Sequence, residues 1–131
     1  MISTKGRYAI RMMLDLAEYG KTRPLPLKEI ADRQDISKKY LEIIAKELVT
    51  GGLIIGSSGK NGGYRLLREP KDYTIGEILE QMEGTLSPVA CLADETYECP
   101  RKDACKTLPM WREFDQMIHD FFYGKTLEEL L

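Results

Sequence analysis

Three cysteines lie close together in the last third of the chain, at Cys91, Cys99 and Cys105. Thiolates are soft ligands that select iron–sulfur clusters or zinc. The C-x7-C-x5-C spacing therefore predicts an iron–sulfur cluster of the two-iron or four-iron type, with zinc as the second choice. The spacing lacks the C-x2-C pairs of zinc fingers, and an odd number of cysteines disfavours a set of structural disulfides. From the residues alone, three cysteines without a chemical role remain the alternative.

A second group of residues has the chemistry to bind DNA. Ser37 predicts the N-cap of a helix that runs to about Thr50 with the apolar stripe Leu41, Ile44, Ala45, Leu48 and Val49. Lys can donate to guanine and Glu can accept from cytosine, so we expect base or backbone contacts from Ser37, Lys38, Lys39, Tyr40, Glu42 and Lys46. The Gly-rich segment that follows and its return strand add candidates for minor-groove or phosphate contact, namely Lys60, Asn61 and Arg65. At the start of the chain, Lys5 and Arg7 are expected to hold phosphates. The alternatives are a solvated helix surface and an ordinary turn.

The elements needed to position these residues form a winged helix-turn-helix. Apolar periodicity and capping residues predict helices from Ser3 or Thr4 to Gly20, over 27–33, and after Ser37. Two β-rich runs, 53–55 and 64–67, predict a hairpin with a flexible glycine-rich tip. Thr74 and Glu77 form the capping-box pattern of a fourth helix that ends at Gly84.

The predicted fold class is mainly α with a small β-hairpin, organised in three parts. Residues 1–84 form the winged helix-turn-helix DNA-binding domain, 85–107 a cysteine-containing sensor loop, and 108–131 a dimerisation helix with a C-terminal turn. The last helix carries a large apolar stripe made of Leu108, Trp111, Phe114, Ile118, Phe121 and Phe122. Pairing with a second copy predicts a homodimer that binds a palindromic operator, with recognition helices about 34 Å apart. Core packing within one chain is the alternative.

The net charge of −2 conceals a strongly polarised chain. Residues 1–68 carry 13 Lys and Arg against 7 Asp and Glu, a net charge of +6, whereas residues 69–131 carry 6 against 14, a net charge of −8. A basic half can neutralise phosphates. No signal peptide and no membrane-spanning run of about 20 apolar residues is recognisable, so we expect a cytoplasmic protein. The single histidine lies far from every cysteine, which disfavours an enzyme with a Cys/His pair.

On these residues the chain resembles the Rrf2 family of bacterial transcription regulators. The matching stretches are Ser3–Ala9, Ile36-Ser37 with Tyr40-Leu41-Glu42, Gly62–Tyr64, and Glu83-Gly84 with Ser87-Pro88-Val89. The resemblance implies a dimeric winged-helix repressor or activator with its wing in the minor groove and its C-terminal helix at the dimer interface. It also implies that the three cysteines occupy the loop in which cluster-bearing members hold iron.

The chain departs from the family pattern at three positions. Leu108 stands where IscR-like members have a histidine ligand, Tyr8 stands where NsrR-like members have an aspartate ligand, and Ser58 replaces a frequent wing arginine. His119 lies 11 residues beyond Leu108, about 16 Å along a helix, and is expected to be an ordinary surface residue. The remaining sources of a fourth ligand are a partner-chain group, a small thiol, Asp94, Glu98 or Asp103.

Two other functions stay open at this stage. CymR-like members lack these cysteines, yet the opening residues and the Ser-Pro-Val stretch are similar to that branch. The alternative within regulation is therefore oxidation of Cys91, Cys99 or Cys105 to a disulfide or mixed disulfide, or binding of a partner enzyme to this loop as in CymR-like proteins. A protein-interaction adaptor or iron–sulfur carrier is the alternative from another class, and it predicts no binding to promoter DNA.

Overall fold

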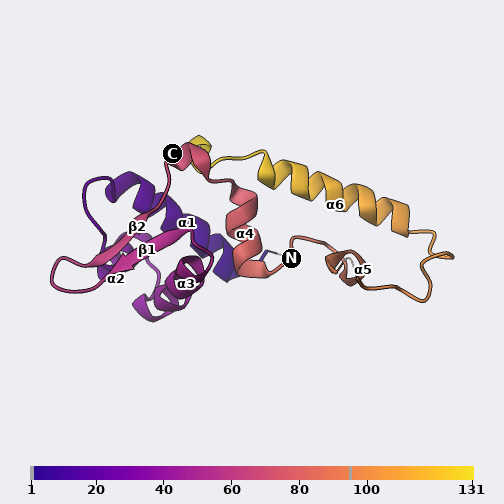
Figure 1. Cartoon of the computed structure of the whole chain (residues 1–131), viewed down its shortest axis with the longest axis horizontal. Coiled ribbons are helices and arrows are strands. Elements are labelled where there is room, and N and C mark those ends of the chain that lie inside the picture. The colour runs from indigo at the N-terminus through magenta and orange to yellow at the C-terminus, as the bar shows by residue number, and fades with distance from the viewer. Residues whose placement is uncertain (1, 95) are drawn as a thin grey trace.

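The computed structural model describes residues 2–94 and 96–131. The elements in chain order are α1 (Thr4–Tyr19), α2 (Leu27–Gln34), α3 (Lys38–Thr50), β1 (Ile54–Ser57), β2 (Gly63–Leu66), η1 (Pro70–Asp72), α4 (Ile75–Glu83), α5 (Ala90–Ala93), α6 (Leu108–Tyr123) and η2 (Glu128–Leu130). Figure 1 shows α1–α4 and the hairpin gathered at one end, with α6 extending away toward the cysteine segment. The prediction of a mainly helical winged fold with a long C-terminal helix is confirmed.

The helices begin where capping side chains replace missing backbone partners. Ser3, Ser37 and Thr74 each accept a hydrogen bond, 3.0–3.1 Å long, from the backbone N–H three residues further on. The Glu77 carboxylate accepts from the Thr74 backbone N–H at 3.0 Å, which completes the expected capping box. The short helix α5 is an element that sequence periodicity did not predict.

The wing is fixed to the helix-turn-helix by backbone hydrogen bonds. Strands β1 and β2 pair antiparallel, with Ile54 opposite Leu66 and Ser57 opposite Gly63. Leu25, between α1 and α2, exchanges two 2.9 Å backbone bonds with Tyr64 and so adds a third short segment to the hairpin. Gly63 adopts φ 154° directly against the Leu25 backbone, and any Cβ there would collide with that backbone. The wing and the helices therefore form one rigid unit.

The core lies where α1, α3 and α4 pack together. Its fully buried side chains include Met12, Met13, Leu16, Ile30, Leu41, Ile44, Leu48, Ile78 and Leu79. The charged side chain of Asp15 in α1 is also buried there. Its carboxylate is satisfied by hydrogen bonds from Arg33 at 2.8 and 3.0 Å and from Gln34 at 2.9 Å. The prediction that Val49 belongs to the buried stripe is wrong. Val49 follows the fully buried Leu48 in the last turn of α3, but at about 100° per residue it lies at the margin of the buried stripe and is 42% exposed.

The C-terminal segment returns from α6 to the winged domain. The Ile75 N–H donates to the Lys125 carbonyl at 2.9 Å, and the Leu127 N–H donates to the Tyr73 carbonyl at 3.0 Å. Leu127 is fully buried. These bonds are made by residues that follow α6, and within α6 itself the buried residues are Leu108 and Ile118. Across residues 2–94 and 96–131, no helix is long and apolar enough to cross a membrane.

Candidate DNA-binding surface and cysteine cavity

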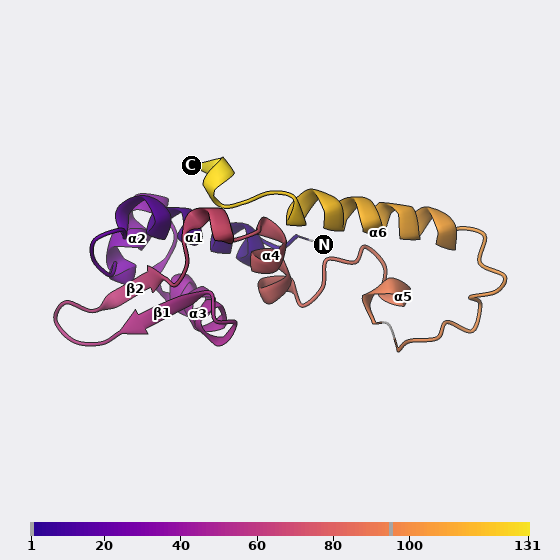
Figure 2. The same cartoon turned by 45° about the horizontal axis from the view of Figure 1, so that its top comes forward.

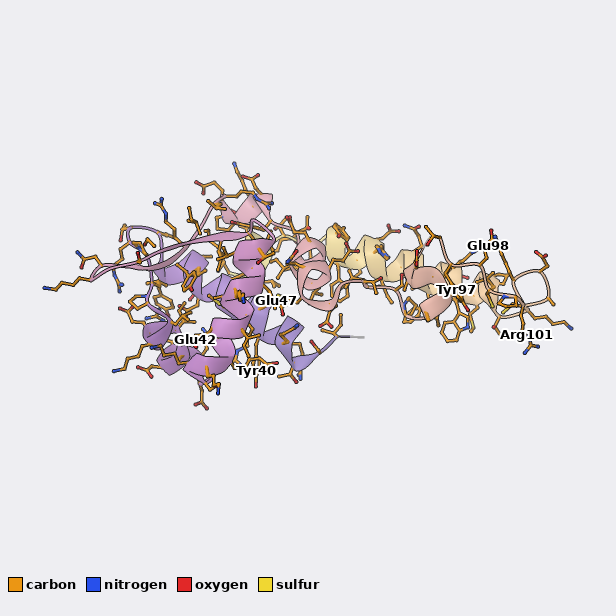
Figure 3. All side chains as sticks on the ribbon, turned by 60° about the horizontal axis from the view of Figure 1, so that its bottom comes forward. Tyr40, Glu42, Glu47, Tyr97, Glu98 and Arg101 are labelled. Carbon is orange, nitrogen blue, oxygen red and sulfur yellow. The ribbon has the colours of Figure 1, made fainter. Side chains whose placement is uncertain are left out.

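Helix α3 presents most of the expected DNA-contacting side chains to solvent. Ser37, Lys38, Lys39, Glu42 and Lys46 are all exposed. They are on the side away from the buried Leu41, Ile44, Ala45 and Leu48. Tyr40 differs, because its half-buried ring packs edge-on against Tyr8 of α1 with centroids 5.8 Å apart. Figure 3 shows Glu42 on this helix, at the opposite end of the molecule from Tyr97, Glu98 and Arg101.

Lys5 does not project freely toward a phosphate. Its ammonium donates to Glu47 of α3, with Nζ and Oε1 2.9 Å apart, and both side chains are about one-third exposed. The hydrogen bond to Glu47 raises the pKa of Lys5 above its ordinary value. The Gln81 side chain of α4 donates to the Glu47 carbonyl at 2.9 Å. Lys5 and Gln81 thus fix the C-terminal half of α3.

The basic and amide side chains of the wing are exposed to solvent. Lys60 and Asn61 are exposed between β1 and β2, and Arg65 is exposed on β2. Tyr73 fastens the base of this hairpin. Its hydroxyl donates to the Leu53 carbonyl at 2.7 Å and accepts from the Leu67 and Arg68 N–H groups at 2.9 and 3.1 Å.

All three cysteines line one cavity of about 260 Å³ between α5 and the start of α6. Figure 2 shows the segment that carries them looping beside α6, far from the winged domain. Local hydrogen bonds give this segment its shape. The Ser87 hydroxyl donates to the Leu92 carbonyl at 3.1 Å, and the Lys102 N–H donates to the Cys99 carbonyl at 3.0 Å. The other residues lining the cavity are Leu92, Asp94, Tyr97, Lys102, Leu108 and Arg112.

The cavity favours negatively charged ligand atoms. The Thr107 hydroxyl, which lies 3.4 Å from Cys105 Sγ, lowers the pKa of that thiol, with help from nearby backbone N–H groups and Arg101. Hydrogen bonds from Thr96, at 2.6 and 2.9 Å, lower the pKa of Asp94. Of the three carboxylates considered as a fourth ligand, only Asp94 lines the cavity. Within the described ranges, no three ligating side chains stand close enough together to hold a metal ion as they are.

One turn of α4 connects the distant parts of the molecule. Glu80 accepts from the Tyr123 hydroxyl of α6 at 2.6 Å and lies 3.3 Å from His119 Nε2. The next residue, Gln81, is the one that bonds α3, and Glu83 accepts from the Ser3 N–H and hydroxyl at 2.8 and 2.6 Å. Gly84 follows directly and leads into the cysteine segment. This single turn therefore touches α6, α3 and α1 at the root of the loop.

His119 lies on the surface of α6, as expected, and its partly exposed side chain also contacts a neighbouring helix. Its side chain is 32% exposed, and it stacks on Tyr123 with ring planes 2° apart. Its Nδ1 lies 2.9 Å from the Asp115 carbonyl oxygen, a contact that, together with the Asp115 and Glu80 charges, raises the pKa of His119. Spacing along α6 could not reveal the contact between His119 and Glu80, because Glu80 is on another helix.

An apolar groove runs along the exposed side of α6. It has a volume of about 390 Å³ and is lined by Ile2, Phe114, Met117, Ile118, Phe121 and Phe122. Met117 and Phe121 are 61% and 58% exposed. Of the predicted apolar stripe, Phe114 and Phe121 are exposed, Trp111 and Phe122 are half-buried, and Leu108 and Ile118 are buried.

This fold and its exposed basic helix and wing define a DNA-binding transcription regulator of the winged-helix class. The Rrf2 family profile, described as "Iron-dependent Transcriptional regulator", matches residues 2–131. The chain belongs to the Rrf2 family, as the resemblance predicted. Because this is a family of transcription regulators, the expectation that the chain is not an enzyme is confirmed.

Relatives and solved structures cover nearly the whole chain. "Protein rrf2" of Nitratidesulfovibrio vulgaris is 35% identical over 130 residues, which is 99% of this chain and 86% of that protein. "HTH-type transcriptional regulator IscR" of Pectobacterium atrosepticum is 34% identical over 99% of this chain and 78% of its own length. The solved structure of CymR (YrzC), the global cysteine regulator of B. subtilis, has a TM-score of 0.80 and 36% identity, covering 99% of this chain and 95% of that one. T. potens IscR has a TM-score of 0.75 and 32% identity, covering 99% and 85%.

Proposed function

We propose that this regulator binds a palindromic operator in the cytoplasm as a homodimer, and that an iron–sulfur cluster held by Cys91, Cys99 and Cys105 controls its affinity. The observation that carries the proposal is the convergence of all three cysteines on one cavity. The three-part division into residues 1–84, 85–107 and 108–131 is part of the proposal.

The DNA contacts follow from the exposed side chains. Helix α3 enters the major groove, where its base and backbone contacts come from Ser37, Lys38, Lys39, Tyr40, Glu42 and Lys46. The wing reaches the minor groove or the phosphates through Lys60, Asn61 and Arg65. Lys5 contributes by holding Glu47, and through it α3, rather than by a free phosphate contact.

The dimer forms through the apolar groove of α6. Phe121, Met117 and Phe114 are large, exposed and contiguous, and contiguous apolar patches of this kind mark interfaces. Phe121→Glu places a charge in the middle of the groove, so we expect a monomer in sedimentation analysis. Met110→Glu, which changes a 53% exposed residue outside the groove, is the matched control and should remain dimeric. Equal behaviour of the two variants contradicts this interface.

The donor set suits a cluster. Three thiols line the cavity, Cys105 has a lowered pKa that favours the thiolate, and Lys102 and Arg112 offset negative charge. Asp94 is the candidate fourth ligand within the chain. When bound, an iron–sulfur cluster supplies a bond network among the thiolates that is sensitive to oxygen and redox state. The three cysteine side chains would move inward to ligating distance, which orders the irregular segment 85–107.

The ordered segment acts on DNA binding through α4. Ordering of the segment displaces Gly84, and the displacement reaches the neighbouring Glu83 and Gln81 first. These two side chains bond the start of α1 and the backbone of α3. Glu80 keeps the same turn attached to α6. The two winged domains of the dimer are thereby set at one separation with the segment ordered and at another without it.

Anaerobic reconstitution with iron and sulfide tests the cofactor. We expect visible charge-transfer absorbance and bound iron in the wild-type chain, a loss of both in each Cys→Ser variant, and a change in operator affinity on loading. Asp94→Asn should weaken retention of the cluster, whereas Asp103→Asn, outside the cavity, should not. A colourless, iron-free protein after reconstitution contradicts the cluster, and unchanged operator affinity on loading contradicts its control of DNA binding.

A second candidate is control by thiol oxidation. The lowered pKa of Cys105 favours its reactive thiolate, and this chain is similar to Staphylococcus aureus CymR, solved in an oxidised form, with a TM-score of 0.74 and 29% identity, covering 99% of this chain and 94% of that one. It predicts a disulfide or mixed disulfide in mass spectra of the oxidised, cluster-free protein, together with a changed operator affinity.

A further inference from the structure

The outward face of α3 has an apolar side chain at its centre. Lys39, Ile43, Lys46 and Thr50 are all exposed, and their spacing of three or four residues places them in one row along a helix. Ile43 is 49% exposed. The buried residues of α3 are on the other side, so Ile43 stands in the middle of the surface that meets the major groove.

Packing does not account for an isoleucine at this position. A single exposed apolar residue is common on protein surfaces, but this one is surrounded by the charges of Lys39, Glu42 and Lys46. It lines an open hollow with Lys46, Glu47, Thr50 and Gln81. A β-branched residue also lowers helix propensity on an exposed face.

We propose that Ile43 is a specificity-determining residue that contacts the 5-methyl group of a thymine in the operator. The inference rests on the proposed placement of α3 in the major groove. Isoleucine has no side-chain donor or acceptor, and the thymine methyl is the apolar group that a base displays in that groove. Ile43 therefore selects a T·A pair at its position.

The neighbouring side chains define the context of that thymine. Lys39 and Lys46 flank Ile43 along the row, with Cβ atoms about 5–6 Å away. Both can donate to guanine or phosphate, while Glu42, next to Ile43 in sequence, can accept from a cytosine amine. The methyl contact thus falls among polar base contacts.

Removal of single methyl groups from the DNA tests the inference. An operator is selected from a random duplex library with the full-length chain, and each thymine is then replaced in turn by deoxyuridine. We expect about fourfold weaker binding by the wild-type protein at one thymine per half-site, the loss typical of one buried methyl-sized group. Ile43→Ala should be insensitive to that replacement. Val49→Ala, which truncates an apolar residue that is exposed on another side of α3, should keep the wild-type pattern.

A second variant guards against a general defect. Ile43→Gln keeps a long side chain on the helix and can form two hydrogen bonds with adenine, so library selection should yield adenine in place of that thymine. An unchanged deoxyuridine pattern for Ile43→Ala overturns the inference and leaves operator binding intact. A wild-type protein that selects no sequence overturns the proposed placement of α3 and, with it, the role of Ile43.

Discussion

Replacing Tyr73 by phenylalanine should destabilise the winged domain through the loss of one hydroxyl group. Tyr73 is fully buried, and its hydroxyl serves Leu53, Leu67 and Arg68 at once. The Leu53 carbonyl is in a residue only 3% exposed, so leaving it without a donor costs about 1–3 kcal/mol. Leu67 and Arg68 are exposed, and water can replace the hydroxyl, so their N–H groups add about 0.5 kcal/mol each. We expect the free energy of unfolding to fall by about 3 kcal/mol.

Urea denaturation followed by circular dichroism measures this loss. A change of about 3 kcal/mol corresponds to a melting temperature lower by roughly 10 °C in a chain of this size. Tyr123→Phe is the matched control, because it removes one hydrogen bond at a 40% exposed residue and should cost less than about 1 kcal/mol. If the two variants unfold at the same urea concentration, Tyr73 does not fasten the hairpin.

Two further predictions concern the polar contacts between helices. The pKa of His119 is raised above its ordinary value of 6.5, first by the Asp115 carbonyl and also by the charges of Asp115 and Glu80. The stabilisation is therefore complete below pH 6.5 and is lost as the pH rises through the folded-state pKa, so the difference in unfolding free energy between wild type and His119→Gln should be larger at pH 6 than at pH 8.5. Asp15→Asn removes the negative charge that Arg33 meets in a buried site, and denaturation should show a loss of about 2 kcal/mol; a loss below about 0.5 kcal/mol contradicts a structural ion pair.

Local signals in the sequence were sufficient for α1, α2, α3, α4 and α6, but not for the short helix α5. The caps at Ser3, Ser37 and Thr74 and the ends at Gly20 and Gly84 depend on neighbours within one turn, so their residue types predict them. Val49 fits the apolar spacing of α3 but lies at the margin of the buried stripe, where its side chain stays 42% exposed. Periodicity records which residues could be buried, and tertiary packing decides which are.

The candidate sites depend on contacts that sequence spacing does not encode. The spacing of the cysteines predicted ligands, but their placement on one cavity with Asp94 required the fold of segment 85–107. The pairing of His119 with Glu80 required α6 to lie against α4. Ile43 did leave a signal in the sequence, since it falls outside the apolar stripe of α3, and its 49% exposure is seen only in the structure.

The two backbone bonds between Leu25 and Tyr64 limit what a signal can change. They join the wing to the segment before α2, so the wing and α3 move as a single body. In the proposed homodimer, a displacement of α4 relative to α6 can alter the distance between the two winged domains, but it leaves the base preference of each one intact. Operators that share a half-site sequence would then be distinguished by the number of base pairs between the half-sites.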